Sequence, residues 1–157
     1  MLKIRFIVVD RTRASFLKEG EGIYLERLKR YSQIEWIEVK PAVIKKGRAE
    51  EYIRKKEGRE IAKRLKSDDY VIALDPSGRQ YNSEKFAGWL EKLSISVSGW
   101  VSFIIGGPIG LSGDISNRAD SILSLSKLTL THEMCRILLL EQVYRAFTIM
   151  EGGKYHK

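Results

Sequence analysis

Apolar residues recur along this chain in two alternating patterns, short continuous runs and helical spacing. Runs rich in β-branched residues predict strands at Ile4–Val9, Ile34–Val39, Tyr70–Leu74 and Val101–Ile105, and a weaker run predicts a fifth at Ile122–Ser126. Parallel strands need crossover connections, which helices usually supply. The alternation therefore predicts an α/β fold with a mostly parallel sheet flanked by helices.

Four segments between and after these runs have the spacing of amphipathic helices. They cover about Ala14–Tyr31, about Arg48–Leu65, a helix beginning near Ser83, and about Glu133–Met150. Asn82 or Ser83 can cap the third helix. Glycines should loosen the middle of the first, since glycine is a poor helix former. The first has apolar positions at Phe16, Ile23, Leu25 and Leu28. In the second, we expect Tyr52, Ile53, Ile61 and Leu65 to face inward and the many Lys and Arg outward.

The last helix has almost no polar face. Its apolar residues are Met134, Ile137, Leu138, Leu139, Leu140, Val143, Tyr144, Ala146, Phe147, Ile149 and Met150. A helix that is apolar on most sides must be covered on most sides, and one sheet covers only part of it. A second copy of the same helix across a two-fold axis would cover the rest, so we predict a homodimer through this helix. The alternative is a helix buried wholly within a monomer.

Length and composition indicate one ordinary globular domain over residues 1–157. The chain is 43% hydrophobic and 31% charged. Its longest apolar stretch is interrupted by Arg136, Glu141 and Arg145, so we expect no membrane span. The N-terminus runs directly into a strand pattern, without the apolar core of a signal peptide. The single cysteine, Cys135, can form no internal disulfide, and we expect a cytoplasmic protein.

Most of the net charge of +8 lies in one segment. Residues 40–66 hold 11 basic and 4 acidic residues. One interpretation is the solvated face of a helix. The other is a phosphate-binding patch, since clustered Lys and Arg gain affinity by releasing counterions from a polyanion.

Two glycine-bearing or hydroxyl-rich segments could form a ligand site. Phe103–Gly110 reads as a buried strand ending in a Gly-Gly-Pro turn, at the edge of the sheet where α/β proteins bind ligands. It matches neither the dinucleotide fingerprint nor the P-loop. Ser124–His132 is a polar loop whose hydroxyls could bind an adenine edge while its leucines enclose the ring. The same loop also reads as a capped helix start with Thr131 as N-cap.

The chain end and the remaining polar residues give weaker indications of function. Tyr155 and His156 follow a Gly-Gly pair and suit base stacking and proton transfer, although chain ends are usually frayed. No zinc spacing, second histidine of H-E-x-x-H or G-x-S-x-G elbow occurs, so no metal site and no acyl-transfer triad are expected. Asp68 and Asp69 precede a strand, and we expect them to be solvated.

Together these segments resemble a known family. The resemblance rests on Tyr70-Val-Ile-Ala-Leu-Asp75, Phe103-Ile-Ile-Gly-Gly-Pro-Ile-Gly-Leu111, Leu123-Ser-Leu-Ser-Lys-Leu-Thr-Leu130, His132-Glu-Met-Cys-Arg136, Leu140-Glu-Gln-Val-Tyr-Arg-Ala-Phe147 and the terminal Tyr-His-Lys. It is dense from about residue 70 to the end. The sequence is similar to the family that methylates N3 of a pseudouridine in large-subunit ribosomal RNA, which belongs to the SPOUT, or trefoil-knot, methyltransferases.

The resemblance implies a knotted cofactor-binding part over about residues 70–157 and a homodimer around the knot and last helix. The implied cofactor is S-adenosylmethionine, and the implied partner is ribosomal RNA rather than DNA or a membrane. The family's cofactor-binding positions fall on Leu74, Gly106, Leu125, Ser126, Lys127, Leu128, Thr129 and Leu130.

The tail matches a family motif close to the methyl group, which leads to a mechanistic hypothesis. His156 takes the proton from N3, Tyr155 positions the base, and Arg136 or Arg145 contacts phosphate or the anionic ring. A non-enzymatic ribosome-assembly protein on the same fold and a SPOUT enzyme acting on tRNA are the alternatives.

Two departures from the family pattern stand out. The segment after the first strand carries charge at Asp10, Arg11 and Arg13 where a glycine-containing turn is usual. Thr131-His132 replaces the usual Pro-His before the last helix. We expect the first to affect RNA docking and the second to alter the angle at which the chain enters the helix.

Overall fold

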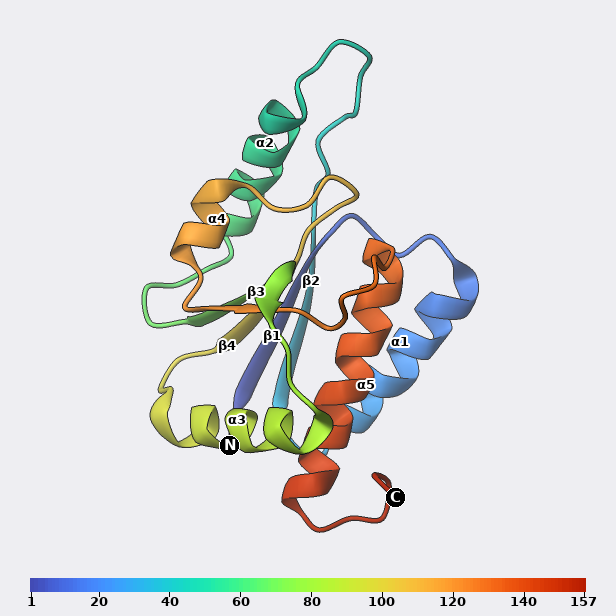
Figure 1. Ribbon diagram of the computed structural model, residues 1–157, viewed down its shortest axis with the longest axis vertical. Coiled ribbons are helices and arrows are strands. Elements are labelled where there is room, and N and C mark those ends of the chain that lie inside the picture. The colour runs from blue at the N-terminus through green and yellow to red at the C-terminus, as the bar shows by residue number, and fades with distance from the viewer.

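The computed structural model describes residues 1–157 and contains one sheet of five parallel strands (Figure 1). Their spatial order is β2-β1-β4-β3-β5. The bounds are β1 Lys3–Val9, β2 Gln33–Val39, β3 Tyr70–Arg79, β4 Val101–Ile105 and β5 Ser121–Leu123. All five predicted strands are confirmed. β3 extends beyond its predicted end, and β5 stops at Leu123 because the following serines hold a loop through their side chains.

Helices cover both faces of the sheet. α1 (Ser15–Leu28), α3 (Ser83–Ser96) and α5 (His132–Met150) pack on one face, and α2 (Glu50–Ala62) and α4 (Gly113–Arg118) on the other (Figure 1). Successive residues of β1 point to opposite faces of the sheet. Phe6 belongs to the core between the sheet and α1, α3 and α5, whereas Ile7 belongs to the core between the sheet and α2 and α4. No helix is both long and apolar enough to span a membrane.

The helix boundaries follow local capping chemistry. The side chain of Asn82 accepts a hydrogen bond from the backbone N–H of Lys85 at 2.8 Å, and Thr131 accepts one from Met134 at 3.2 Å, as predicted for N-caps. α1 runs unbroken through its glycines, contrary to expectation. Gly20 lies against the end of the Ile137 side chain on α5, so α1 and α5 pack closely at this point. α4 was not predicted.

Some apolar side chains of the first two predicted helices are exposed. Phe16 is 71% exposed, and Ile23 and Tyr52 are each 48% exposed. Tyr52 instead lies under the guanidinium of Arg48, 5.1 Å from the ring centroid. The inward assignment of Tyr52 was therefore wrong, and Phe16 and Ile23 belong to a face of α1 that the chain does not cover.

The charged turn after β1 has a structural reason. Asp10 adopts φ 71°, the left-handed region that glycine favours and that Asp tolerates better than most residues. Its carboxylate accepts hydrogen bonds from the backbone N–H of Arg11 at 2.8 Å and from the guanidinium of Arg13 at 2.9 Å. The side chains at this departure from the family pattern therefore stabilise the turn.

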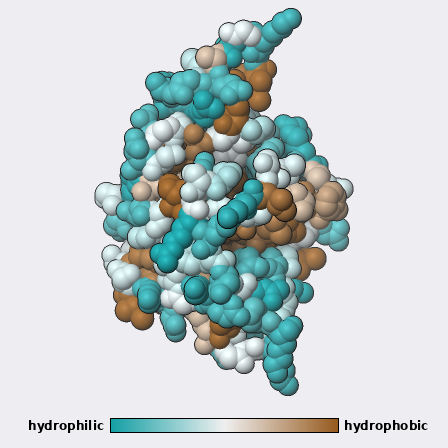
Figure 2. Space-filling model, viewed as in Figure 1, coloured by the Kyte–Doolittle hydropathy of each residue, from teal (hydrophilic) through white to brown (hydrophobic).

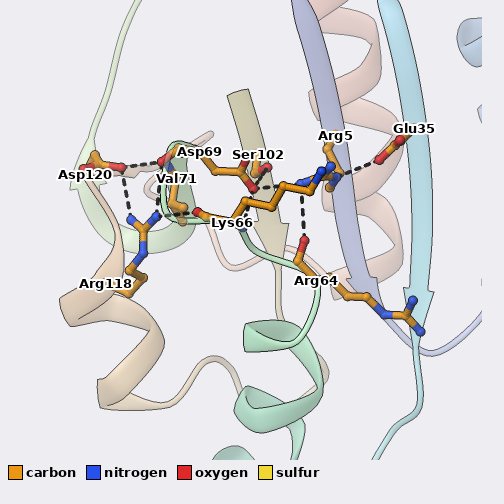
Figure 3. A network of polar contacts seen from close by, with 9 residues as sticks. All are labelled: Arg5, Glu35, Arg64, Lys66, Asp69, Val71, Ser102, Arg118 and Asp120. Carbon is orange, nitrogen blue, oxygen red and sulfur yellow. Dashed lines mark hydrogen bonds and ion pairs between the residues drawn. The ribbon is translucent and has the colours of Figure 1, made fainter. Parts of the chain in front are cut away.

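The prediction for Asp69 was also wrong. Asp68 is exposed, but Asp69 is buried and accepts a hydrogen bond from Arg5 at 2.7 Å (Figure 3). Arg5 also donates to Glu35 at 2.7 Å and to the backbone carbonyl of Arg64 at 3.2 Å. A buried carboxylate needs such partners, and this network ties the starts of β1 and β3 to the end of α2. Sequence reasoning missed it because Arg5 and Asp69 are 64 residues apart.

Candidate active site

A cleft of about 710 Å³ opens beyond the carboxyl ends of β3, β4 and β5. This volume lies within the range of small-molecule sites. Its walls come from segments far apart in the sequence: the β3 extension, the glycine turn after β4, the loop after β5 and the starts of α1 and α5. The lining residues include Leu74, Asp75, Gly106, Gly107, Gly110, Leu125, Ser126, Leu128, Thr129, Leu130, His132, Cys135, Ala14, Phe16 and Leu17.

The structure brings together nearly all the predicted cofactor-binding positions. Leu74, Gly106, Leu125, Ser126, Leu128, Thr129 and Leu130 all line this cleft. Lys127 is the exception and does not line it.

The glycine turn has a shape that only glycines allow. The N–H of Gly110 donates to the carbonyl of Gly107 at 3.0 Å, and Gly110 has φ 82°. A Cβ atom at Gly106 would lie 2.9 Å from the carbonyl carbon of Gly110. The turn therefore folds tightly on itself and presents backbone rather than side chains to the cleft.

The loop after β5 is held by its own hydroxyls. Ser124 Oγ donates to the carbonyl of Ser126 at 3.0 Å, and Ser126 Oγ accepts from the N–H of Leu128 at 3.0 Å. The N–H of Ser124 donates to the carbonyl of Arg79 at 3.0 Å, which joins the loop to the β3 extension. A polar loop ordered in this way leaves leucine side chains beside fixed backbone groups, as an adenosine site requires.

Sequence reasoning reached the start of α5 only as far as His132 and missed the wall given by α1. Glu133 accepts hydrogen bonds from the backbone N–H groups of Arg13 at 2.5 Å and Ala14 at 3.1 Å, and so joins the two helix starts. Burial lowers the pKa of His132, with the nearby Arg136 acting in the same direction, which favours a neutral ring at neutral pH. Burial raises the pKa of the Cys135 thiol. The position of Thr131-His132 directly after the polar loop was the available signal.

The predicted catalytic tail lies outside the cleft. Tyr155 packs edge-on against Tyr144 with 4.8 Å between ring centroids and donates to Glu141 at 3.1 Å. Burial, followed by hydrogen bonding with Tyr24 and the charge of Glu141, raises the pKa of the Tyr155 hydroxyl. Neither Tyr155 nor His156 lines the cleft. Within one chain, the tail and the cleft are separate features.

His156 is held between two charged side chains. Its Nε2 lies 2.9 Å from Glu84 Oε1, and its Nδ1 lies 3.3 Å from a guanidinium nitrogen of Arg145. Because arginine can only donate, Nδ1 is the acceptor and Nε2–H donates to Glu84. Arg145 also donates to Glu141, which raises the pKa of the guanidinium.

Arg136 has no access to a ligand in this arrangement. Its side chain is fully buried and donates to the carbonyl of Val9 at 2.6 Å and to Thr12 Oγ1 at 2.9 Å. Thr12 in turn bonds the buried carboxylate of Glu21. Arg136 thus joins α5 to the end of β1, and Arg145 is the partly exposed arginine of the two proposed from sequence.

The basic segment 40–66 forms the projecting loop before α2 and α2 itself (Figure 1). Part of its charge is balanced within the helix, as in the pairs of Arg54 with Glu50 and of Lys63 with Glu60. Lys45, Lys46 and Lys56 form no ion pair. The segment lies on the other face of the sheet from α5 and the tail.

Comparison with known proteins identifies the family. The model of a family described as predicted SPOUT methyltransferase matches residues 2–156. The chain belongs to the SPOUT methyltransferases. The family assignment confirms the resemblance drawn from sequence and marks the chain as an enzyme.

Curated relatives of this SPOUT methyltransferase span its full length. A protein named ribosomal RNA large subunit methyltransferase H from Syntrophotalea carbinolica is 42% identical over 155 residues, 99% of each chain. One of the same name from Streptococcus uberis is 40% identical over 159 residues, covering 99% of this chain and all of that one.

Solved structures are similar in fold at lower identity. A probable methyltransferase from Bordetella pertussis superposes with a TM-score of 0.58 at 13% identity, covering 93% of this chain and 95% of that one. A tRNA (m1G37) methyltransferase from Aquifex aeolicus gives a TM-score of 0.53 at 16% identity, covering 91% and 69%. At these identities the likeness concerns the fold alone.

Proposed function

We propose that this chain transfers a methyl group from S-adenosylmethionine to N3 of a pseudouridine in large-subunit ribosomal RNA. One observation carries the proposal: the segments that resemble the family's cofactor loops are separated in the sequence, yet they meet around a single cleft of suitable size. The relatives named ribosomal RNA large subunit methyltransferase H support the choice of substrate. We place the protein in the cytoplasm and treat residues 1–157 as one domain.

The lining of the cleft fits an adenosine-bearing sulfonium. Leu125, Leu128 and Leu130 supply apolar contacts for a base, and backbone groups of the loop and of the glycine turn supply hydrogen bonds. Gly106 carries no side chain, and a Cβ atom there would meet the backbone of Gly110, so the turn borders the cleft with backbone alone. When bound, the cofactor supplies an electrophilic methyl group for direct displacement, so the protein's task is alignment and exclusion of water.

In this proposal His156 removes the N3 proton and Tyr155 positions the base. His156 Nδ1 is the unprotonated ring nitrogen and accepts from Arg145, so proton uptake at Nδ1 requires that contact to open. Arg145, released from His156, can then face a phosphate or the anionic ring. For Arg136 we propose only that it holds the start of α5 in place, because its side chain is fully buried.

We propose that the active form is a homodimer through α5. The tail contacts Glu141 and Arg145, whereas the cleft lies at His132. At 1.5 Å per residue, these positions are about 14 to 20 Å apart along the helix. A tail supplied by the second copy would bring His156 to the cleft without unfolding this helix.

An apolar surface is available for that contact. Hydrophobic atoms gather around the N-terminal ends of α1 and α5 (Figure 2). The exposed large apolar side chains on α1, on α5 and on the loop before α5 are Phe16, Ile23, Leu128, Met134 and Leu138. A patch of this kind on an otherwise charged surface is typical of an interface.

We also propose a knot in the C-terminal part. The β3 extension packs directly on β5, since a Cβ atom at Gly78 would lie 2.7 Å from the backbone of Ile122 and Leu123. The chain after β5 then continues past the extension to α5. Such close backbone contact supports a threaded arrangement.

The decisive experiment maps modified nucleosides by mass spectrometry in ribosomal RNA and tRNA from a strain lacking the gene. We expect N3-methylpseudouridine to disappear from large-subunit RNA and to return with the wild-type gene but not with His156→Ala. Loss of a methyl group from tRNA would identify the other SPOUT substrate class. Unchanged RNA together with no cofactor binding would favour an assembly protein without catalysis.

A further inference from the structure

α2 contacts the glycine turn of the cleft from the opposite face of the sheet. Arg54 donates through a guanidinium nitrogen to the backbone carbonyl of Ile109 at 3.2 Å. Ile109 lies between Gly107 and Gly110, which both line the cleft. Arg54 also pairs with Glu50 and Glu51 at 3.5 Å each, so its guanidinium is held in place on the helix.

One helical turn further along, Glu57 contacts the same glycine turn. The residue is 4% exposed, and its Oε1 is buried without a hydrogen-bond partner. A Cβ atom at Gly107 would lie 3.3 Å from that oxygen, so the carboxyl group packs directly on the turn. A charged oxygen buried without a hydrogen-bond partner destabilises the folded state. Burial therefore raises the pKa of Glu57, and the charge of Asp10 acts in the same direction.

Glu57 also holds the loop that precedes α2. Its Oε2 accepts a hydrogen bond from the backbone N–H of Ala42 at 3.1 Å. Ala42 belongs to the projecting basic loop, which also carries Lys45 and Lys46. One buried side chain therefore contacts both the proposed RNA-binding loop and the wall of the cofactor cleft.

We propose that Arg54 and Glu57 are positioning residues that couple RNA contact along the basic segment to cofactor binding in the cleft. This inference rests on the proposed function. Displacement of α2 or its loop by RNA shifts the carbonyl of Ile109 and the backbone at Gly107, which form part of the cleft. By linkage, the factor by which RNA changes cofactor affinity equals the factor by which cofactor changes RNA affinity.

The test measures the dissociation constant of labelled S-adenosylhomocysteine by equilibrium dialysis, with and without ribosomes that lack the methylation. We expect ribosomes to change this constant in the wild type by at least about fivefold, the lower end of usual allosteric coupling. Arg54→Met should reduce the change to less than about twofold and raise KM for the cofactor more than it lowers kcat.

Lys55→Met is the matched control. It removes the same charge from the same helix, but Lys55 pairs only with Glu51, at 3.9 Å, and does not contact the turn. Because Lys55 belongs to the basic segment, Lys55→Met is compared at saturating ribosome, where we expect it to retain the ribosome effect on cofactor affinity. Arg54→Lys, which keeps a charged donor, should restore part of it. An equal loss of coupling in Arg54→Met and Lys55→Met would overturn the proposal.

Glu57 is tested by two variants of similar size. Glu57→Gln keeps an acceptor for the N–H of Ala42 and should retain the coupling, whereas Glu57→Met removes that acceptor and should lose it. Thermal unfolding checks that both fold. Coupling in Glu57→Met at the wild-type level, or a wild type whose cofactor affinity ribosomes do not change, contradicts the inference and leaves the methyltransferase proposal standing. A wild type that binds no cofactor contradicts both.

Discussion

Replacement of Arg136 by methionine tests whether this arginine is structural or catalytic. The substitution keeps the length and apolar stem but removes the donors to the carbonyl of Val9 and to Thr12. Two buried hydrogen bonds from a charged group contribute about 1.5–3 kcal/mol each. Glu21 would also lose the charge of Arg136, which acts to lower the pKa of its carboxyl group against the larger effect of burial. Removing the cation from such a buried network costs about 3–5 kcal/mol.

The expected loss of unfolding free energy is therefore about 3–5 kcal/mol. For a chain of this size, each kcal/mol lowers the melting temperature by about 2–4 °C, which gives a decrease of about 6–20 °C. Calorimetry or circular dichroism measures it directly. Combining Arg136→Met with Glu21→Gln should recover part of the loss, because no uncompensated carboxylate is then left buried.

Arg145→Met is the matched control on the same helix. Arg145 is partly exposed and paired with Glu141, so its removal should cost no more than about 1 kcal/mol. The structural assignment is refuted if Arg136→Met melts like the wild type and yet loses methylation. Arg136 would then act on the RNA after all.

Three further predictions concern the cleft, the buried carboxyl and the basic segment. Gly106→Val should abolish S-adenosylhomocysteine binding in calorimetry and also lower the melting temperature, because its Cβ atom would meet the backbone of Gly110; unaltered binding would move the site elsewhere. Burial raises the pKa of Glu57 in the folded state above its ordinary value of 4.5, so the folded state binds this proton more tightly than the unfolded state does. The protonated carboxyl group therefore contributes to the free energy of unfolding at low pH, and this contribution is lost as the pH rises through the raised pKa. The stability gained by Glu57→Gln should thus grow from pH 4.5 upward, and a constant difference would contradict the assignment. Charge reversal at Lys55, Lys56 and Arg59 should weaken ribosome binding while cofactor affinity without ribosomes is unchanged. The slope of log affinity against log salt concentration should become shallower by about 0.9 for each phosphate that the protein no longer neutralises.

The strands were predictable because burial on both faces of a parallel sheet leaves a continuous apolar run, as in Tyr70–Leu74. α4 was not, because six residues carry too little periodicity to indicate a helix. The glycine turn and the polar loop were recognisable as candidate site segments, since each has a local chemical signature. Nothing local indicates that Phe16 lines the same cleft.

The long-range polar contacts were the least predictable part. Arg136 meets Thr12 across 124 residues, and Asp69 meets Arg5 across 64. Their burial depends on partners that only the assembled fold brings near. From sequence alone, a charged residue next to a strand is expected to be solvent-exposed. For Asp69 this expectation was wrong.

Cofactor binding tests the central claim most directly. Titration of the wild-type protein with S-adenosylhomocysteine in a calorimeter should show saturable binding, and Cys135→Ser, whose side chain lines the cleft without closing it, should retain it. Gly106→Val should show none. Absence of heat and of any thermal shift in the wild type would contradict the account.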